Sequence, residues 1–359
     1  MMEVLQRTAL FDDHVAAGGR IVSFAGYELP VQYSGVIAEA KAVRAAAGMF
    51  DVSHMARLVL TGDRVLEYLE YITTNDVSKL TDSTGQYSMF PNDKGGIIDD
   101  IIVYRISQDE FRIVANAANH VKDLVWMRLQ NHFGVLITDQ TDETCMIAVQ
   151  GPNAVATLCS MAERPDELKN APLFGVSEQK IAGIDCFVAR SGYTGEDGFE
   201  VICSRGDGSA LWKALLTKGV VPCGLGARDV LRVEAGLPLY GHELEDELSP
   251  IAAGLGWVIS KTKEFVGSDI INAARLNGTD TKLVGLKLET KRVAPIDAQV
   301  AIDGEPVGTV CSGVFSPALD CGIAFAFCKP TLKIGDQVTV EVRGTAEPAT
   351  VVSKRFLRN

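Results

Sequence analysis

The chain has 359 residues, with 46 Asp and Glu against 34 Lys and Arg, and a formal net charge of −12. This acidic balance argues against sequence-independent nucleic-acid binding, which requires a dense positive field. A hydrophobic content of 47% is enough to form a core and excludes a disordered chain. The length predicts two or three domains, and a small anionic ligand would require only a local cluster of arginines.

No targeting or membrane signal is predicted. The first 19 residues are interrupted by charges, including Glu3, Arg7 and Asp12, so they lack the apolar centre of a signal peptide. No apolar run approaches the roughly 20 residues that span a bilayer. We therefore expect a cytoplasmic protein without membrane contact. The eight cysteines form no C-x-x-C pair and are expected to be buried and reduced.

The first 190 residues mix the periodicities of helices and strands. Helices are predicted over 34–49, 63–73, 119–132 and 152–162. Strands are predicted over 85–90, 97–106, 111–115, 145–149 and 176–190, with a hairpin turn at 91–96. Ser34 is the expected N-cap of the first helix, and Pro152 suits the first turn of the fourth.

Beyond residue 280 only strand patterns remain. They cover 283–288, 299–302, 306–312, 322–327, 337–342 and 349–352. Short strands at this spacing, separated by Asp-Gly and Gly-Asp turns, predict a small barrel or sandwich. The body before them lacks a strict βαβ rhythm and the glycine motifs of dinucleotide-binding and P-loop folds. The sequence thus predicts an α+β body followed by an all-β C-terminal domain.

Two adjacent aspartates, Asp99 and Asp100, lie inside an apolar strand pattern. Neighbouring side chains on a strand point to opposite faces, so the two carboxylates cannot share one environment. A buried carboxylate needs a partner or a chemical role. The spacing alone leaves open that both are solvated near the hairpin end.

A glycine-rich loop at 191–200 carries three acids, Glu196, Asp197 and Glu200, as candidate acceptors for the N–H edge of a ligand. A plain hairpin with solvated acids is the alternative. A second glycine-containing segment leads into a helix on which Arg228 and Arg232 lie four residues apart. Because a cation is unfavourable at a helix N-terminus, Arg228 indicates an anionic partner, unless it pairs with a neighbouring acid.

The sequence supports neither a metal site nor a catalytic triad. His54 has no second histidine at ligand spacing, so no metal site is predicted. The G-x-S-x-G pattern of a nucleophile elbow is absent, so no catalytic triad is assigned.

Six motifs follow one another along the chain. They are Phe50-Asp-Val-Ser-His-Met55, Gly95-Gly-Ile-Ile-Asp-Asp100, Asn116-Ala-Ala-Asn119, Gly192-Tyr-Thr-Gly-Glu-Asp-Gly-Phe-Glu200, Gly224-Leu-Gly-Ala-Arg-Asp229 and Ser312-Gly-Val-Phe-Ser-Pro317. Taken together and in this order, they resemble the T-protein (aminomethyltransferase) family of the glycine cleavage system. The resemblance runs from Arg7 to about Phe356.

The resemblance implies a three-domain, cloverleaf-like α+β fold around a folate site. It consists of two α+β domains with antiparallel sheets and an all-β C-terminal barrel or jelly roll. The implied boundaries are a discontinuous first domain at 1–56 and 140–240, an inserted domain at 57–139, a helical connection at 241–279 and the β domain at 280–359.

The implied reaction transfers a one-carbon unit from the aminomethyl-lipoyl arm of the H protein to tetrahydrofolate. It yields methylenetetrahydrofolate, ammonia and the reduced lipoyl arm, and it requires no metal. Asp100 matches the essential acid of the family. The positions implied to bind folate or substrate are Met55, Tyr87, Asn116, Tyr193, Glu200, Arg228 and Tyr240. We also expect Arg232 and Arg292 to line this cavity.

Two related functions remain as alternatives. One is a tetrahydrofolate-dependent demethylase acting on a small methylated amine or sulfonium compound. The other is a non-catalytic folate-binding relative that supports iron–sulfur assembly; it is disfavoured because its lysine-glycine-cysteine motif is missing from 239–250. One departure from the T-protein pattern is Val293-Ala-Pro295, where many members have a second arginine followed by glycine.

Overall fold

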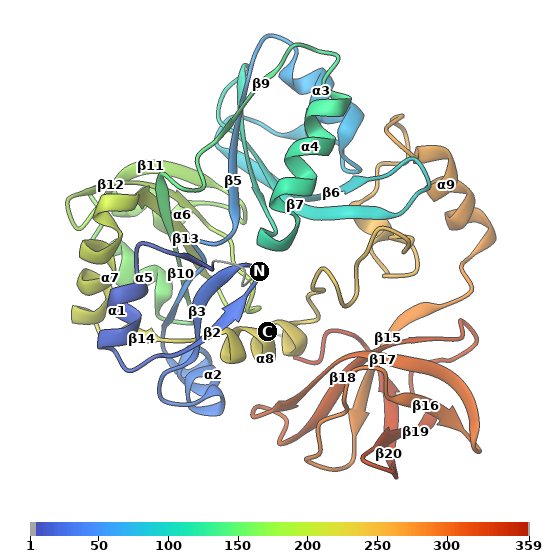
Figure 1. The fold of residues 1–359 in the computed structure, drawn as a ribbon. Helices are drawn as coiled ribbons and strands as arrows, with labels where there is room; N and C mark the ends of the chain where they lie inside the picture. Colours follow the sequence, from blue (N-terminus) through green and yellow to red (C-terminus); the bar gives the residue numbers. More distant parts are fainter. Residues whose placement is uncertain (1–4, 358–359) are drawn as a thin grey trace. The chain divides into compact units, whose positions relative to one another are not determined.

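The computed structural model describes residues 5–357, so the outermost positions of the predicted terminal domains lie outside it. The chain divides into two compact units (Figure 1). Unit 1 comprises Met1–Ile72, Val77–Ser88 and Ile101–Arg228. Unit 2 comprises Thr73–Asp76, Met89–Asp100 and Asp229–Asn359.

Unit 1 contains most of the helices and strands that belong to three sheets. Its strands are β1 (Gln6–Arg7), β2 (Arg20–Phe24), β3 (Tyr27–Gln32), β4 (Gly48–Asp51), β5 (Ala56–Thr61), β8 (Glu110–Ala115), β9 (Leu136–Asp139), β10 (Thr144–Gln150), β11 (Val176–Ile181), β12 (Ile184–Ala189), β13 (Gly198–Ser204) and β14 (Val221–Pro222). Its helices are α1 (Phe11–Ala16), α2 (Val36–Ala45), α3 (Val65–Ile72), α4 (His120–Gln130), α5 (Ala154–Cys159), α6 (Pro165–Asn170) and α7 (Gly208–Thr217), with 3-10 turns η1 (Val77–Lys79), η2 (Ala117–Asn119) and η3 (Arg205–Asp207).

A six-stranded sheet forms the centre of unit 1, in the order β11-β12-β13-β10-β4-β14. Its pairs are antiparallel except for β4 with β14. Helices α5 and α7 pack on it, as Figure 1 shows, and bury Leu158, Leu211 and Trp212 in the same apolar core as Ile147 and Phe199. Burial of these side chains is the main favourable contribution to this fold. A small sheet, β1-β3-β2, precedes it in the chain.

A five-stranded sheet has the order β6-β7-β8-β5-β9. Its strands β6 (Thr84–Pro91) and β7 (Ile97–Arg105) form the predicted hairpin, and the chain passes along them from unit 1 into unit 2. All five strands come from residues 56–139, whereas the six-stranded sheet combines β4 with strands after residue 143. The predicted insertion of one domain into another, and its boundaries, stay a prediction.

Unit 2 ends in a closed barrel, β15-β18-β17-β16-β19-β20. The strands are β15 (Lys282–Leu288), β16 (Gln299–Ile302), β17 (Glu305–Ser316), β18 (Cys321–Cys328), β19 (Gln337–Val342) and β20 (Thr345–Val352). Helix α8 (Leu225–Ala235) leads into unit 2, followed by η4 (Gly256–Val258) and α9 (Ser268–Asn277). All six strands predicted after residue 280 are present, so the predicted fold class, an α+β body with a C-terminal β barrel, is confirmed.

The helix predicted over 34–49 is shorter in the structure. Helix α2 begins at Val36, and its N-cap is Gly35 instead of Ser34. The carboxylate of Glu39 accepts hydrogen bonds from the backbone N–H of Tyr33, at 2.6 Å, and of Gly35, at 2.9 Å. An internal glutamate therefore satisfies the backbone donor of the N-cap and one that precedes it, as the glutamate of a capping box reaches back to the N-cap N–H. Residues 48 and 49, assigned to the end of this helix, belong to strand β4 (48–51).

Two other boundaries also differ from the prediction. The strand over 176–190 is a hairpin, because Ala182 and Gly183 have φ values of 51° and 80° and reverse the chain. Positive φ at both central residues is characteristic of a two-residue hairpin turn. The helix predicted from Pro152 begins at Ala154, after Asn153 at the N-cap.

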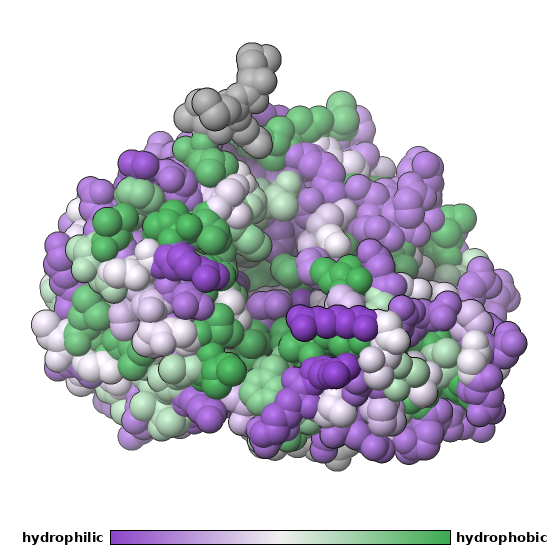
Figure 2. Space-filling model, turned by 60° about the horizontal axis from the view of Figure 1, so that its bottom comes forward, coloured by the Kyte–Doolittle hydropathy of each residue, from purple (hydrophilic) through white to green (hydrophobic). Residues whose placement is uncertain are grey.

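The surface carries isolated exposed apolar side chains, including Val121, Leu173 and Leu276, and Figure 2 shows hydrophilic and hydrophobic residues interspersed over one face. Among the described residues, no helix has both the length and the apolar character needed to cross a membrane. All eight cysteines are free, and six of them are buried, as expected for reduced thiols.

Candidate active site

The structure distinguishes the three acids of the glycine-rich loop by their partners. Glu196 Oε1 lies 2.8 Å from Arg44 Nη1, and Asp197 Oδ2 lies 2.6 Å from Arg190 Nη2. Both carboxylates are therefore neutralised by arginines within unit 1. Glu200, on β13, instead accepts a hydrogen bond from a neutral hydroxyl. Glu200 is thus the acid of this loop that is not committed to a salt bridge with one of these arginines.

Glu200 lies in a buried polar chain. Its side chain is 8% exposed, and the hydroxyl of Ser191 donates to its Oε2 atom. The hydroxyl of Tyr104, on β7, donates in turn to Ser191 Oγ at 3.2 Å. Burial raises the pKa of Glu200, and this rise is opposed by the Ser191 hydrogen bond and by the positive charge of Arg228.

Arg228 and Tyr193 complete this cluster. The guanidinium carbon of Arg228, in the first turn of α8, lies 4.7 Å from the ring centroid of Tyr193, a cation–π contact. Burial lowers the pKa of Arg228, while the charges of Glu200 and Tyr193 favour its protonated form. Among the described residues, its inaccessible Nη1 atom has no hydrogen-bond partner. The neighbouring Asp229 pairs with Arg232 instead.

The glycine-rich loop packs against Gln150, the last residue of β10, and is hydrogen-bonded to it. Gln150 Nε2 donates to the carbonyl of Ser191 at 2.9 Å, and Thr194 Oγ1 donates to Gln150 Oε1 at 2.9 Å. A Cβ atom at Gly192 would lie 1.8 Å from Gln150 Oε1, and one at Gly198 would lie 2.2 Å from the carbonyl oxygen of Val149. Both glycines are therefore required by close packing, and they fix the loop that leads to Glu200.

The segment carrying Met55 is anchored by two buried charges. Asp51 Oδ1 accepts from the backbone N–H of Ser53 at 2.9 Å, and Arg57 Nη1 donates to the carbonyls of Ser53, at 2.9 Å, and of Met55. Met55 itself is half-buried. Burial and the nearby arginines lower the pKa of His54 to about 4, so its imidazole is neutral at pH 7.

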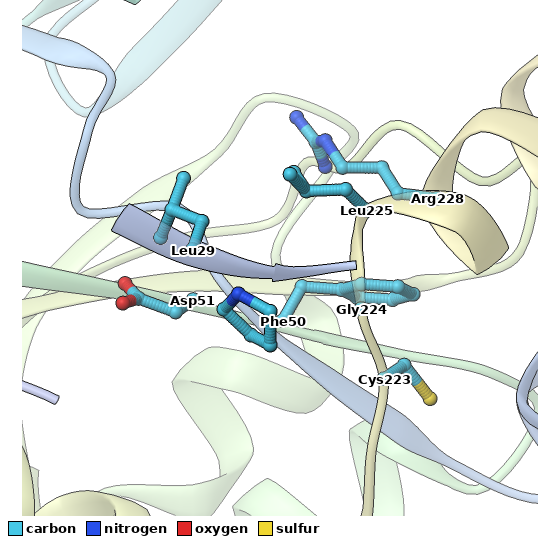
Figure 3. Close-up of a pocket in the computed structure, with 8 residues that line it drawn as sticks. Leu29, Phe50, Asp51, Cys223, Gly224, Leu225 and Arg228 are labelled. Carbon is cyan, nitrogen blue, oxygen red and sulfur yellow. The ribbon is translucent and has the colours of Figure 1, made fainter. Parts of the chain in front are cut away.

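A small pocket opens beside the start of α8, and Figure 3 shows the residues that line it. Arg228 and Leu225 reach it from the helix, and Leu29 reaches it from β3. The guanidinium of Arg228 and the carboxylate of Asp51 point to different sides of this pocket. Asp51 is directed instead to Thr8 Oγ1, at 2.6 Å, and to His14 Nε2, at 2.9 Å.

In unit 2, the two adjacent aspartates differ in exposure. Asp99 is completely buried, whereas Asp100 is half-buried. The alternation predicted for these two side chains on β7 is therefore present. The alternative that both aspartates are solvated near the end of the hairpin does not apply to Asp99. Of the two carboxylates, that of Asp100 can be reached from outside the core.

The start of β7 is held by the segment around Tyr240. Tyr240 Oη donates to the carbonyl of Ile97 at 3.2 Å, and the N–H of Ile97 donates to the carbonyl of Glu245 at 3.2 Å. A Cβ at Gly96 would lie 1.8 Å from the carbonyl oxygen of Asp246. This close backbone packing fixes the strand three residues before Asp100.

The remaining predicted site residues are Tyr87 on β6 and Asn116 at the end of β8, and both are half-buried in unit 1. The structure thus brings together Tyr193, Glu200 and Arg228 in unit 1, and connects Tyr240 to the strand of Asp100 in unit 2. Sequence reasoning missed Ser191 and Tyr104. For Ser191, the only available signal was that a polar residue directly precedes the Gly192 motif. The sequence around Tyr104 contained no signal of a role in the site.

The other two arginines expected at the cavity have structural partners. Arg232 Nη1 lies 2.7 Å from Glu243 Oε2, and its Nη2 donates to Ser312 Oγ at 2.7 Å. Arg292 Nη1 lies 2.9 Å from Glu347 Oε1. Within residues 5–357, no group of three or more histidine, cysteine, aspartate or glutamate side chains is arranged to hold a metal ion.

Two family models match the chain: the GCVT N-terminal domain over residues 10–263 and the glycine cleavage T-protein C-terminal barrel domain over residues 281–357. The aminomethyltransferases of a Picosynechococcus strain and of Halalkalibacterium halodurans are each 42% identical over 99% of this chain, and the matches cover 98% and 99% of those proteins. The solved structure of glycine cleavage system aminomethyltransferase T from Bartonella henselae is 32% identical, with a TM-score of 0.92 over 98% of both chains. This chain therefore belongs to the glycine cleavage T-protein family.

Proposed function

We propose that this protein is the aminomethyltransferase of a glycine cleavage system. It transfers the one-carbon unit of the aminomethyl-lipoyl H protein to tetrahydrofolate, releases ammonia and forms 5,10-methylenetetrahydrofolate. The family models, together with relatives of that name that match over their full length, support the assignment. Folate is a substrate in this scheme, and the lipoylated H protein is the partner. The expected cytoplasmic location stays a prediction.

The observation that carries the proposal is the environment of Glu200. A pterin presents an N–H and an NH₂ group side by side, and a single carboxylate can accept hydrogen bonds from both. Glu200 is buried and, among residues 5–357, accepts only from a neutral hydroxyl at Oε2, whereas Glu196 and Asp197 are held by arginines. Glu200 is therefore the acid of this loop best suited to the pterin edge.

Arg228 and Tyr193 suit the rest of the folate. The guanidinium of Arg228 has an inaccessible nitrogen without a hydrogen-bond partner in the described part of the chain, and it is stacked on Tyr193. A positive charge so arranged favours an anionic group, which the glutamate tail of folate provides. Met55, Tyr87 and Asn116 in unit 1, and Tyr240 in unit 2, are also proposed to contact folate or substrate.

Asp100 is proposed as the catalytic acid. Transfer requires an amine leaving group, an electrophilic carbon and a nucleophilic folate nitrogen. A carboxylate beside that nitrogen can orient it, stabilise the developing positive charge or relay a proton. Because Asp100 is only partly buried, it is favoured over the completely buried Asp99 for this role.

The test is a reconstituted assay. The purified protein is mixed with aminomethyl-lipoyl H protein and tetrahydrofolate, and methylenetetrahydrofolate and ammonia are measured. The proposal predicts that both products form in equal amounts and only with all three components present. No turnover with the loaded H protein, combined with turnover of a small methylated amine or sulfonium compound, would identify the protein as a demethylase instead.

A further inference from the structure

A one-way chain of hydrogen bonds leads to Glu200. The hydroxyl of Tyr104, which is 1% exposed, donates to Ser191 Oγ at 3.2 Å, and Ser191 donates to Glu200 Oε2. A hydroxyl has a single proton to donate, so a Ser191 that donates to the carboxylate must receive the proton of Tyr104. The direction of both bonds is therefore fixed while Glu200 is ionised, and Oε2 is then an acceptor.

The hydroxyl of Ser191 is held in place from its own backbone. Its carbonyl accepts from Gln150 Nε2 at 2.9 Å, and its N–H donates to the carbonyl of Ala189 at 2.9 Å. Gln150 is completely buried and also accepts from Thr194 Oγ1. Hydrogen bonds thus hold both the backbone and the hydroxyl of Ser191 in place. A serine on the surface would not be held in this way.

We propose that Ser191 is a positioning residue for Glu200: its hydroxyl, held by Tyr104, occupies Oε2 and leaves Oε1 directed to accept from the N–H edge of the pterin. The inference rests on the proposed function, because it assigns the reason why Glu200 is an effective folate acceptor. Ser191 itself is not proposed to touch the folate.

The electrostatic surroundings of Glu200 make this hydrogen bond necessary. Arg228 faces it from α8 and Tyr104 from β7, and Tyr193 acts through its contact with Arg228. Its neighbours in the sheet, Ala148 on β10 and Ala189 on β12, carry no titratable group. Burial raises the pKa of Glu200, and Ser191 and Arg228 are the two groups that counter the rise.

Loss of the Ser191 hydroxyl should therefore have two effects. Oε2 loses its donor, so the carboxylate can rotate away from the direction that the ligand requires. The pKa of Glu200 rises further, and its protonated form presents a donor to a ligand edge that also consists of donors. Both effects weaken folate binding, and the second becomes stronger as the pH falls.

The experiment measures the dissociation constant of tetrahydrofolate between about pH 5 and pH 8 for four proteins. They are the wild type, Ser191→Ala, the conservative Ser191→Thr, and the control Ser177→Ala. Ser177 lies on β11 of the same sheet, and its hydroxyl donates to the exposed Glu167 at 2.8 Å. We expect Ser191→Ala to bind about tenfold more weakly at neutral pH. We also expect its acid limb to move to higher pH and its KM for folate to rise more than kcat falls.

Ser191→Thr should restore most of the affinity, and Ser177→Ala should behave as the wild type. The variant Glu200→Gln separates the two proposals. If Glu200→Gln binds normally, Glu200 is not the folate acceptor, and the inference falls with that assignment. If Glu200→Gln loses affinity while Ser191→Ala keeps the wild-type constant and pH profile, only the inference is overturned. Should Ser191→Ala fail to fold, Ser191→Cys, which keeps only a weak donor, must show a smaller shift of the acid limb in the same direction, and no shift in this variant would overturn the inference.

Discussion

His14 Nε2 lies 2.9 Å from Asp51 Oδ2, and both side chains are completely inaccessible to solvent. Tyr33 Oη lies 2.8 Å from His14 Nδ1, so both ring nitrogens of this histidine have partners. Thr8 Oγ1 donates to the same Asp51 oxygen at 2.6 Å. Because Asp51 also anchors the turn that carries Met55, this buried network connects the stability of unit 1 to the proposed folate site.

Replacing His14 by alanine is expected to destabilise the protein by about 3–5 kcal/mol, because it leaves a buried carboxylate without its principal partner. Denaturant unfolding measures this loss. The control is His120→Ala: His120 Nε2 lies 2.7 Å from Asp139 Oδ2, but the two side chains are 22% and 31% exposed. This partly exposed pair should contribute less than the buried pair, about 1 kcal/mol. Equal losses in the two variants would show that burial does not strengthen the His14–Asp51 pair.

The same pair predicts a pH dependence of stability. The His14 interaction and the hydroxyl and backbone donors lower the pKa of Asp51 from 3.8 to about 2, against the opposing effect of burial. A lowered carboxylate pKa contributes stability that is fully present above about pH 4 and is lost as the pH falls towards 2. In Asp51→Asn, this part of the acid denaturation curve should be missing. If the unfolding free energy of Asp51→Asn falls between pH 5 and about pH 2 by as much as that of the wild type, the assignment is contradicted.

Asp100→Asn should reduce kcat by at least about 100-fold while leaving folate affinity and thermal stability close to the wild type. The matched variant is Asp99→Asn, one residue earlier on β7. Since Asp99 is fully buried, its replacement should lower the melting temperature, with a smaller loss of kcat in the protein that remains folded. Normal turnover by Asp100→Asn would remove it from the catalytic role.

Arg228 is expected to act through both its charge and its planar stacking. Arg228→Ala should weaken folate binding and also raise the pKa of Glu200, because Arg228 is one of the groups that lowers it. Arg228→Lys retains the charge but loses the planar contact with Tyr193, so its affinity should lie between those of the wild type and the alanine variant. Calorimetric titration with tetrahydrofolate measures both. An alanine variant with the wild-type dissociation constant would exclude Arg228 from the site.

The barrel was predictable because some of its strands alternate, β19 and β20 among them, and because its turns are local. Asp303-Gly304 and Arg343-Gly344 adopt positive φ at the hairpin ends, and this conformation is specified by a few neighbouring residues. The end of α2 was not predictable in the same way. Residues 48–51 are buried at every position, so they show no alternation that distinguishes a strand from the end of a helix.

The site was predictable only as far as its residue types. Three acids within five residues are equivalent in sequence, and the choice of Glu200 depends on Arg44, which lies 152 residues before Glu196 in the chain. The sequence likewise does not distinguish Arg228 from Arg232. The two arginines lie four residues apart on α8, but Arg228 contacts Tyr193 and Arg232 pairs with Glu243. Long-range ion pairs depend on the packing of distant elements, which a local pattern does not encode.

Arg232 provides the last prediction, because the structure assigns it to stability instead of ligand binding. It is 1% exposed and bonds to Glu243, which is completely buried, and to Ser312 on the barrel strand β17. Arg232→Ala should lower the free energy of unfolding by about 3–5 kcal/mol, because the carboxylate of Glu243 would be left uncompensated. The folate dissociation constant of the folded fraction should not change. Arg292→Ala is the control: its side chain is 53% exposed, so its pair with Glu347 should contribute less than about 1 kcal/mol. A variant of Arg232 that unfolds normally but binds folate weakly would return this arginine to the ligand site.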